Sequence, residues 1–405
     1  MSSVQLYFAR YAVELCSVHL TPKTHIIRSP QLEQNELSIV HFNRMQLEDW
    51  FDRYQYEIDY DIGESGIKYL NVNTLGVDLG RLGLRYGYHT GNPELRTLIS
   101  EQYEGFGPDQ IAVTTGSSEA NFAVIASLVD TSQHIIIEHP NYPSLYEVPR
   151  SLGLPHDLFG LVYEENFEPN LGKLESLFKH GTKLVTLTHP NNPTGSVISE
   201  KVLREVIDLV ESHDAYLLHD ETYRELSFDK PPPPAAILSD RAISMTTLSK
   251  AYGIPGARIG WIAGPKQIIE SVRAVREQIT ICNNTLGEAI ASVALKQRAS
   301  ILESARVRML RNFEILKRWI SHQDSLEWVE PKGGVVAFPR LKNSVTTEEI
   351  CRLLVTKYRT FSVPGYTFGM DKHLRIGFGG DTEELTEGLD RLKKAIEECT
   401  SGLRA

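Results

Sequence analysis

Short apolar runs rich in β-branched residues alternate with helical patterns between about residue 95 and residue 265. The runs are IAVTT (111–115), HIIIEH (134–139), KLVTLT (183–188), AYLLHD (215–220), AISMTT (242–247) and RIGWIA (258–263). Helical stretches such as 199–213 lie between several of these runs. Strands that alternate with helices in this way predict a mainly parallel sheet with helices on both faces.

The pattern changes on either side of this region. From Met45 the chain reads as a helix that leads into a glycine-containing loop, whereas residues before it show no periodicity. After a long helical region (about 265–322), short apolar runs and two further helices predict a smaller α+β domain. The expected organisation is an N-terminal extension with no assigned role (1–44), an arm and loop that join the small domain (45–84), a large domain (85–280) and a small domain (281–405).

Composition and charge exclude several classes of function. The 405 residues include 42 Lys and Arg against 52 Asp and Glu, and the formal net charge is −10. This acidic balance argues against binding to nucleic acid or to anionic membrane surfaces, and no apolar run is long enough to span a bilayer. The four cysteines (Cys16, Cys282, Cys351 and Cys399) are widely spaced, which argues against a disulfide framework or a metal site. A cytoplasmic location is therefore expected.

Polar residues follow the ends of the predicted strands, where sheets of this type place their functional groups. Each has an ordinary structural explanation, such as a helix cap, a tight turn or a surface lysine. Together they match what pyridoxal 5′-phosphate (PLP) needs: an amine, a carboxylate for the pyridine nitrogen, donors for the ring oxygen and a phosphate cradle. The segments are GSS (116–118), HPNNPTG (189–195), DETY (220–223) and TLSK (247–250), followed by Arg258.

Several of these segments resemble the signature motifs of a known family. PNNPTG (190–195), DETY (220–223), TLSKAYGIPGARIGW (247–261) and YGYHTGNPELR (86–96) are similar to those of fold-type I, aspartate-aminotransferase-like enzymes, over roughly residues 60–395. The resemblance implies an α/β fold with a mainly parallel seven-stranded sheet in the large domain and a small α+β domain. It also implies a PLP cofactor and a homodimer with shared active sites.

The resemblance implies a role for each site residue. Lys250 would bond covalently to the cofactor and then move protons, and Asp220 would pair with the pyridine nitrogen. Tyr223 and Asn192 would bond the ring oxygen, and Tyr142 would stack on the ring. Lys250, Asp220 and Tyr223 are the expected catalytic residues. The groups expected around the phosphate are Gly116, Ser117, Ser118, Thr247, Ser249 and Arg258, with Tyr86 supplied by the partner subunit.

Three further segments resemble a narrower group within this family. Residues 47–70, 331–340 and 361–378 are similar to hydroxyarginine cyclases that form capreomycidine or enduracididine. This implies a cyclodehydratase of natural-product biosynthesis that acts on a small amino acid with a guanidine group. A 3-hydroxy substrate would lose water directly and close a six-membered ring, whereas a 4-hydroxy substrate would also lose a Cβ proton and close a five-membered ring. The sequence leaves both possibilities open.

The substrate contacts expected from the sequence are Arg375, Glu64 and Asp61. Arg375 would hold the α-carboxylate in a bidentate pair. Glu64 and Asp61 are hypothetical partners of the guanidinium, and the alternative is that both are solvated loop acids.

A conventional aminotransferase that uses 2-oxoglutarate is the main alternative function. It would need the same cofactor groups. A PLP-binding transcriptional regulator is disfavoured because residues 1–44 are too few and too little basic for a winged helix. A nicotinamide oxidoreductase is disfavoured because no GxGxxG motif follows an early strand.

Overall fold

The computed structural model describes residues 41–342 and 344–402. The described residues belong to one compact unit. The expected N-terminal extension (1–44) therefore lies almost wholly outside the described residues. In the part of the chain that is described, no helix is both long and apolar enough to cross a membrane.

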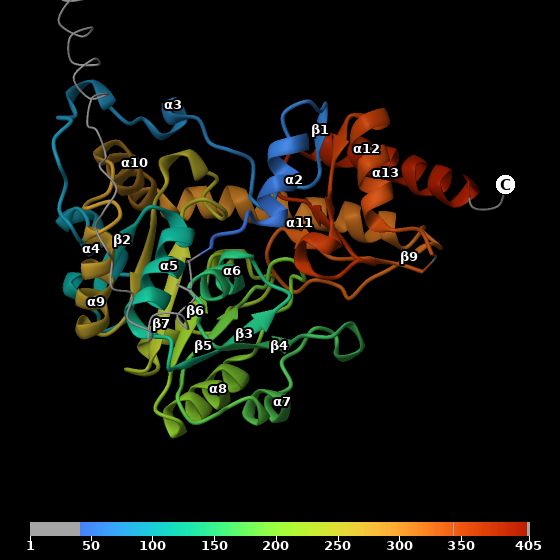
Figure 1. Cartoon of the computed structure of the whole chain (residues 1–405). Helices are drawn as coiled ribbons and strands as arrows, with labels where there is room; N and C mark the ends of the chain where they lie inside the picture. The colour runs from blue at the N-terminus through green and yellow to red at the C-terminus, as the bar shows by residue number, and fades with distance from the viewer. Residues whose placement is uncertain (1–40, 343, 403–405) are drawn as a thin grey trace, which may run out of the picture. The chain divides into compact units, whose positions relative to one another are not determined.

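A seven-stranded sheet forms the centre of the fold (Figure 1). Its order is β2-β8-β7-β6-β5-β3-β4, and all neighbours are parallel except β8, which runs antiparallel to β2 and β7. This confirms the expected mainly parallel sheet. The strands are β2 (Ile111–Thr114), β3 (His134–His139), β4 (His156–Gly160), β5 (Thr182–Thr188), β6 (Tyr216–Asp220), β7 (Ala242–Thr247) and β8 (Gly260–Ala263).

Helices cover both faces of this sheet, which explains why its strands read as continuous apolar runs. In β3, Ile135 and Ile137 belong to one buried cluster and Ile136 to the other, because successive side chains point to opposite faces. The first cluster includes side chains of α5 (Gly116–Leu128), α6 (Ser144–Ser151) and α9 (Lys266–Glu277). The second includes side chains of α4 (Pro93–Ser100), α7 (Leu171–Ser176), α8 (Glu200–Ser212) and α10 (Thr285–Lys296).

Strand β4 has no counterpart among the six apolar runs of the sequence. It lies at the edge of the sheet, where it pairs with β3 alone. Only Phe159 of its five residues is buried. An edge strand that is half exposed carries no long apolar run, so its sequence does not mark it as a strand.

The C-terminal elements form a separate α+β group. Its helices are α11 (Arg298–Ile320), α12 (Thr347–Tyr358) and α13 (Thr382–Gly402). Its short strands are β9 (Leu326–Glu327), β10 (Val336–Ala337), β11 (Arg340–Leu341), β12 (Thr360–Phe361), β13 (Val363–Pro364) and β14 (Leu374–Gly377). The boundary between the large and small domains at residues 280/281 stays a proposal. Helix α10 follows this boundary but packs against α4, which belongs to the expected large domain.

The N-terminal arm packs with these C-terminal elements (Figure 1). Helix α2 (Gln46–Tyr54) and strand β1 (Tyr60–Asp61) make these contacts, whereas the short helix α3 (Val72–Leu75) packs against α10. Strand β1 pairs in parallel with β12. In α2, the indole Nε1 of Trp50 donates to the carbonyl of Ser362 at 2.9 Å. These contacts place the loop after β1 against the C-terminal sheet.

That loop, residues 62–70, crosses the end of β14 and the residues after it at two glycines. A Cβ atom on Gly377 would lie 1.9 Å from the carbonyl oxygen of Glu64, and one on Gly379 would lie 2.2 Å from that of Gly66. The amide of Gly377 donates to Ile62 at 2.8 Å. The two glycines therefore allow the backbones to approach closely enough for Glu64 to be held at a defined position.

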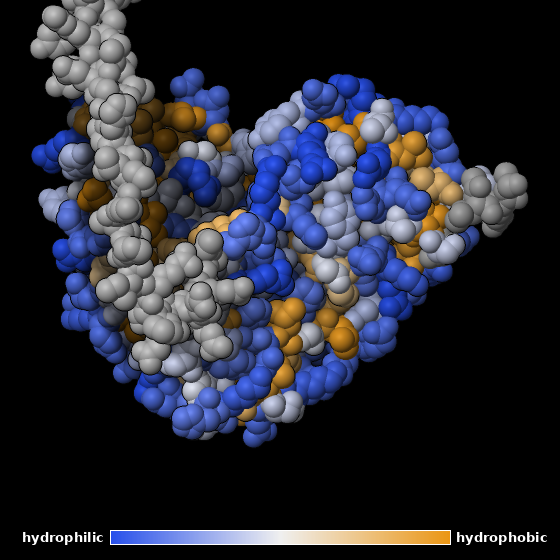
Figure 2. Space-filling model, in the orientation of Figure 1, coloured by the Kyte–Doolittle hydropathy of each residue, from blue (hydrophilic) through white to orange (hydrophobic). Residues whose placement is uncertain are grey.

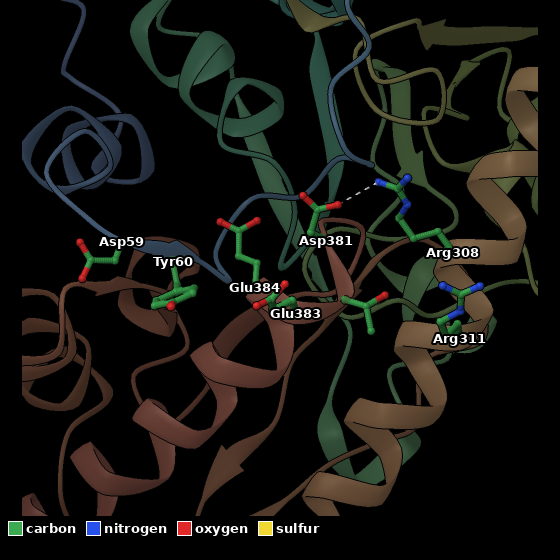
Figure 3. Close-up of a pocket in the computed structure, with 8 residues that line it drawn as sticks. Asp59, Tyr60, Arg308, Arg311, Asp381, Glu383 and Glu384 are labelled. Carbon is green, nitrogen blue, oxygen red and sulfur yellow. Dashed lines mark ion pairs between the residues drawn. The ribbon is translucent and has the colours of Figure 1, made fainter.

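The outer side of this loop is held by charged residues. A pocket of about 640 Å³ lies there, and Figure 3 shows Asp59, Glu384, Asp381 and Arg308 among the residues that line it. Glu384 accepts a hydrogen bond from the amide of Asp61 at 3.0 Å. Asp381 forms ion pairs with Lys68 and with Arg308. The loop is thus fixed on both sides, and its inner side faces the cavity described next.

Candidate active site

A cavity of about 470 Å³ lies where β5, β6 and β7 end. Loop 62–70 and helix α2 contribute its other walls. Topology explains this convergence, because parallel strands end at the same edge of the sheet. Residues predicted from separate motifs therefore line one cavity, and they are Glu64, Ser117, Ser118, Tyr142, Asn192, Asp220, Tyr223, Thr247, Ser249, Lys250, Arg258 and Arg375.

Three predicted site residues do not line the cavity. Gly116 lies behind Arg258; its φ is +78°, and a Cβ there would lie 2.5 Å from Arg258 Nη2. Tyr86 is 85% exposed, on the segment before α4. We expected Asp61 to bind the substrate guanidinium, but its carboxylate points into the loop. It accepts the amides of Gly63 and Glu64 at 2.8 and 2.9 Å, and the side-chain amide of Gln55 at 3.1 Å.

Lys250 and Glu64 form an ion pair in the cavity. Lys250 Nζ lies 3.0 Å from Glu64 Oε1, and Tyr69 donates to Glu64 Oε2 at 3.1 Å. Burial acts to raise the pKa of Glu64, but Lys250 and Arg375 outweigh it and lower the pKa to about 2. Burial acts to lower the pKa of Lys250, but Glu64 outweighs it and raises the pKa. Both groups are therefore charged at neutral pH.

Arg375, on β14, is buried and held by two neighbours. Its Nη1 donates to Asn192 Oδ1 at 3.0 Å and its Nη2 to the carbonyl of Gly63 at 2.8 Å. Its Nε has no hydrogen-bond partner among the residues that the structure describes, although only 1% of Arg375 is exposed. A buried donor without a partner indicates that a ligand acceptor, such as a carboxylate, completes this site.

Asp220, at the end of β6, fits the carboxylate expected to pair with a protonated pyridine nitrogen. It is 5% exposed, and one of its oxygens accepts the amide of Thr222 at 2.9 Å. Burial raises the pKa of Asp220 to about 6. A cationic ring nitrogen beside this carboxylate would lower the pKa again and keep the carboxylate charged.

The other end of the cavity fits a phosphate. Ser117 and Ser118 lie in the first turn of α5, where free backbone amides favour an anion. Thr247 Oγ1 and Ser249 Oγ lie 3.0 Å apart. Arg258 forms no ion pair with any carboxylate in ranges 41–342 and 344–402, so its guanidinium is available to an anion. The residues of the cavity therefore fit PLP at both ends of the cofactor.

Helix α2 supplies a wall that our sequence analysis missed. Leu47, Glu48, Phe51 and Asp52 of the helix line the cavity, as does Gln55, which caps its C-terminal end. Their spacing is that of one helix face. The helix itself is predictable from the sequence, but the direction of its faces depends on packing against the C-terminal elements. Other lining residues that we missed are Tyr56, Ser65, Thr188, Thr222 and Pro255.

A buried acid, Glu138, supports the strand ends from behind. Its Oε2 accepts the amide of Thr188 at 2.8 Å and the side-chain amide of Asn191 at 3.2 Å. Its Oε1 lies 3.3 Å from His189 Nε2. Burial raises the pKa of Glu138 to about 8, and burial lowers the pKa of His189 well below its usual value. Glu138 therefore keeps its proton at neutral pH.

Replacing Glu138 should change how stability depends on pH. The native protein keeps the Glu138 proton up to about pH 8, whereas the unfolded chain loses it near pH 4.5. The unfolding free energy of the wild type should therefore fall by up to about 1.4 kcal/mol per pH unit across this range, relative to Glu138→Gln. Thermal unfolding midpoints at pH 5 and pH 8 measure this difference. The control Glu175→Gln, at an exposed position of α7, should show no such trend. A pH-independent difference for Glu138→Gln would contradict the expectation.

Comparison with known proteins agrees with this geometry. Residues 64–392 match the family model described as aminotransferase class I and II. The chain is 30% identical to capreomycidine synthase of Streptomyces vinaceus over 371 residues, which covers 88% of this chain and 95% of that protein. It is 26% identical to an aspartate aminotransferase of Pyrococcus horikoshii, with 77% of this chain and 83% of that protein covered.

Two solved structures extend the comparison. A PLP-dependent aminotransferase from Streptococcus suis has a TM-score of 0.85 and 31% identity, with 88% of this chain and 98% of that chain covered. The PLP-dependent cyclase OrfR has a TM-score of 0.82 and 26% identity, with 90% and 100% covered. These matches confirm the expected aspartate-aminotransferase-like fold. Since the family model spans most of the sequence, the chain belongs to the aminotransferase class I and II family.

Proposed function

We propose that this protein, a PLP-dependent enzyme of its family, is a cyclase of hydroxylated L-arginine. The reaction would convert 3-hydroxy- or 4-hydroxyarginine into capreomycidine or enduracididine in natural-product biosynthesis. The similarity to capreomycidine synthase and to the cyclase OrfR supports this proposal. The observation that carries it is the distribution of charge in the cavity.

The cavity is lined by more carboxylates than the one that the cofactor requires. Apart from Asp220, the acids Glu48, Asp52 and Glu64 line the cavity. The lining cations of the described chain are Lys250, Arg258 and Arg375, and each already has an expected partner in the cofactor or the substrate α-carboxylate. No lining cation is left for the second carboxylate of aspartate or 2-oxoglutarate. A cationic guanidinium suits these acids better.

The proposed reaction balances without a second substrate. The carbon–oxygen bond of the substrate hydroxyl breaks, and the hydroxyl leaves with one proton as water. A guanidine nitrogen forms the new carbon–nitrogen bond and gives up one proton. The product is the substrate minus one water, so no oxidant, reductant or keto acid is needed.

The residues of the cavity have distinct parts in this reaction. Bound PLP stabilises the negative charge that develops at Cα of the amino acid. Lys250 removes the Cα proton and returns it after ring closure. Asp220 would keep the pyridine nitrogen protonated, and Tyr223 and Asn192 would hold the ring oxygen. Arg375 holds the α-carboxylate, and its bond to Asn192 fixes the orientation of the guanidinium.

A conventional aminotransferase is the second candidate, and the 31% identity to the Streptococcus suis enzyme favours it. Holoenzyme should be incubated separately with 3-hydroxy- and 4-hydroxyarginine, with and without 2-oxoglutarate. We expect one isomer to lose one water and give a cyclic product by mass spectrometry and NMR, at a rate that does not depend on 2-oxoglutarate. Lys250→Ala should be inactive. Formation of glutamate without a dehydrated product would make the protein an aminotransferase.

We infer that the active unit is a homodimer. Leu84, Tyr86 and Tyr88 are exposed, and this segment lies beside the chain at Asn283, near exposed Ile281. Figure 2 shows hydrophobic residues on the side of the molecule where α10 lies. Such a patch suits an interface.

Light scattering should give the mass of two chains, and Tyr86→Glu should reduce both dimerisation and activity. A fully active monomer would contradict this inference.

Glu64 should slow the attachment of PLP to the apoenzyme. Only an unprotonated amine can bond to the aldehyde of the cofactor, and Glu64 raises the pKa of Lys250. Glu64→Gln should therefore increase the rate of reconstitution near neutral pH and move the rate–pH profile to lower pH. Absorbance after mixing apoenzyme with PLP measures this rate. Glu57→Gln, an exposed acid that does not line the cavity, is the control. An unchanged rate–pH profile for Glu64→Gln would show that Glu64 does not control the protonation of Lys250.

A further inference from the structure

The wall formed by α2 has a fixed orientation. Trp50 is buried, its Nε1 is bonded to Ser362, and its ring lies 4.4 Å from that of Tyr54. These contacts turn the opposite side of the helix toward the cavity. Glu48 and Asp52 are four residues apart on that side, so their carboxylates are neighbours on one helix face.

The two carboxylates differ in their partners. Glu48 Oε1 accepts a hydrogen bond from Tyr142 Oη at 2.8 Å. No Lys or Arg within 41–342 and 344–402 forms an ion pair with Glu48. Asp52, in contrast, is bonded to the guanidinium of Arg44 at 2.6 Å, and the same guanidinium contacts Asp49 at 2.9 Å. The acids of this helix thus already bind one guanidinium, whereas Glu48 remains free to bind another.

Arg375 lines the same cavity, and its buried Nε has no hydrogen-bond partner among the residues that the structure describes. Burial lowers the pKa of the Arg375 guanidinium, and the charge of Glu48 acts against this lowering, after the larger effects of Tyr223, Glu64 and Asp61. A cavity lined by a buried cation and by an acid without an ion pair fits an amino acid that has a carboxylate at one end and a cation at the other. Tyr142, which also lines the cavity, is hydrogen-bonded to Glu48.

We propose that Glu48 binds the guanidinium of the substrate side chain and, with Asp52, determines the preference for a cationic over a neutral side chain. The hydrogen bond from Tyr142 holds the Glu48 carboxylate in position. This inference rests on the proposed function, because it names the group that recognises the arginine side chain. It also moves that recognition from Asp61, which holds the loop, to helix α2.

The test uses ligands that lack the leaving hydroxyl. L-arginine and its neutral analogue L-citrulline are titrated into holoenzyme, and binding is followed by cofactor absorbance. Wild type should bind arginine more tightly than citrulline. Glu48→Gln should weaken arginine binding by about 10- to 100-fold, as expected for the loss of a charged hydrogen bond, and leave citrulline binding little changed. Glu48→Asp should restore part of the preference, because it keeps the charge.

Asp49→Asn is the matched control. Asp49 is adjacent to Glu48 on the same helix and also contacts Arg44, but it does not line the cavity. Its arginine affinity should equal that of the wild type. An equal loss for arginine and citrulline in Glu48→Gln would show a merely structural role and overturn the proposal, as would an unchanged arginine affinity.

The two proposals fail in different ways. If the wild type prefers arginine through Glu48 but dehydrates neither hydroxyarginine, the cyclase proposal fails and the guanidinium site stands. If the wild type forms the cyclic product and Glu48→Gln keeps the same affinity for arginine, the guanidinium site fails and the cyclase proposal stands.

Discussion

The position of the Arg375 guanidinium is the constraint on which the rest of the cavity depends. Its two hydrogen bonds join three segments that are far apart in the chain: β14, the turn that carries Asn192, and the loop that carries Gly63. Burying an unpaired guanidinium is costly, so these acceptors are needed for the fold as well as for the site. The close crossing of the loop over Gly377 then determines where Glu64 lies.

The acids of the site show that surroundings, and not residue type, determine protonation. Asp220 and Glu138 are buried and form no ion pair with a Lys or Arg of the described chain, and their pKa values rise to about 6 and about 8. Glu64 is also shielded from solvent, but Lys250 and Arg375 lower its pKa to about 2. Glu138 therefore serves as a neutral support for the strand ends, and Glu64 as the anion that pairs with Lys250. Asp220 lies between these extremes, so a cationic ring nitrogen would decide its charge.

The groups that fit the cofactor and those that we propose to select the substrate come from different parts of the chain. The strand ends supply Asp220, Thr247, Lys250 and the turn with Asn192, and these fit a cyclase and an aminotransferase equally well. The arm before residue 70 supplies Glu48, Asp52 and Glu64. Substrate choice can therefore change through the arm while the sheet and its cofactor site stay the same.

The sequence by itself predicted six of the seven strands and the polar motifs that follow them. Because parallel strands end at one edge of the sheet, it also predicted that these motifs meet there. It also identified the family through local motifs. Only the tertiary structure decided which loop acid faces the cavity and which holds the turn, and how α2 is rotated. Strand β4 was missed because an exposed edge strand needs no apolar run. The rotation of α2 depends on the bond from Trp50 to Ser362, 312 residues away, and such a contact leaves no pattern in the local sequence. Periodicity reports which side of an element is buried, but not which distant element buries it.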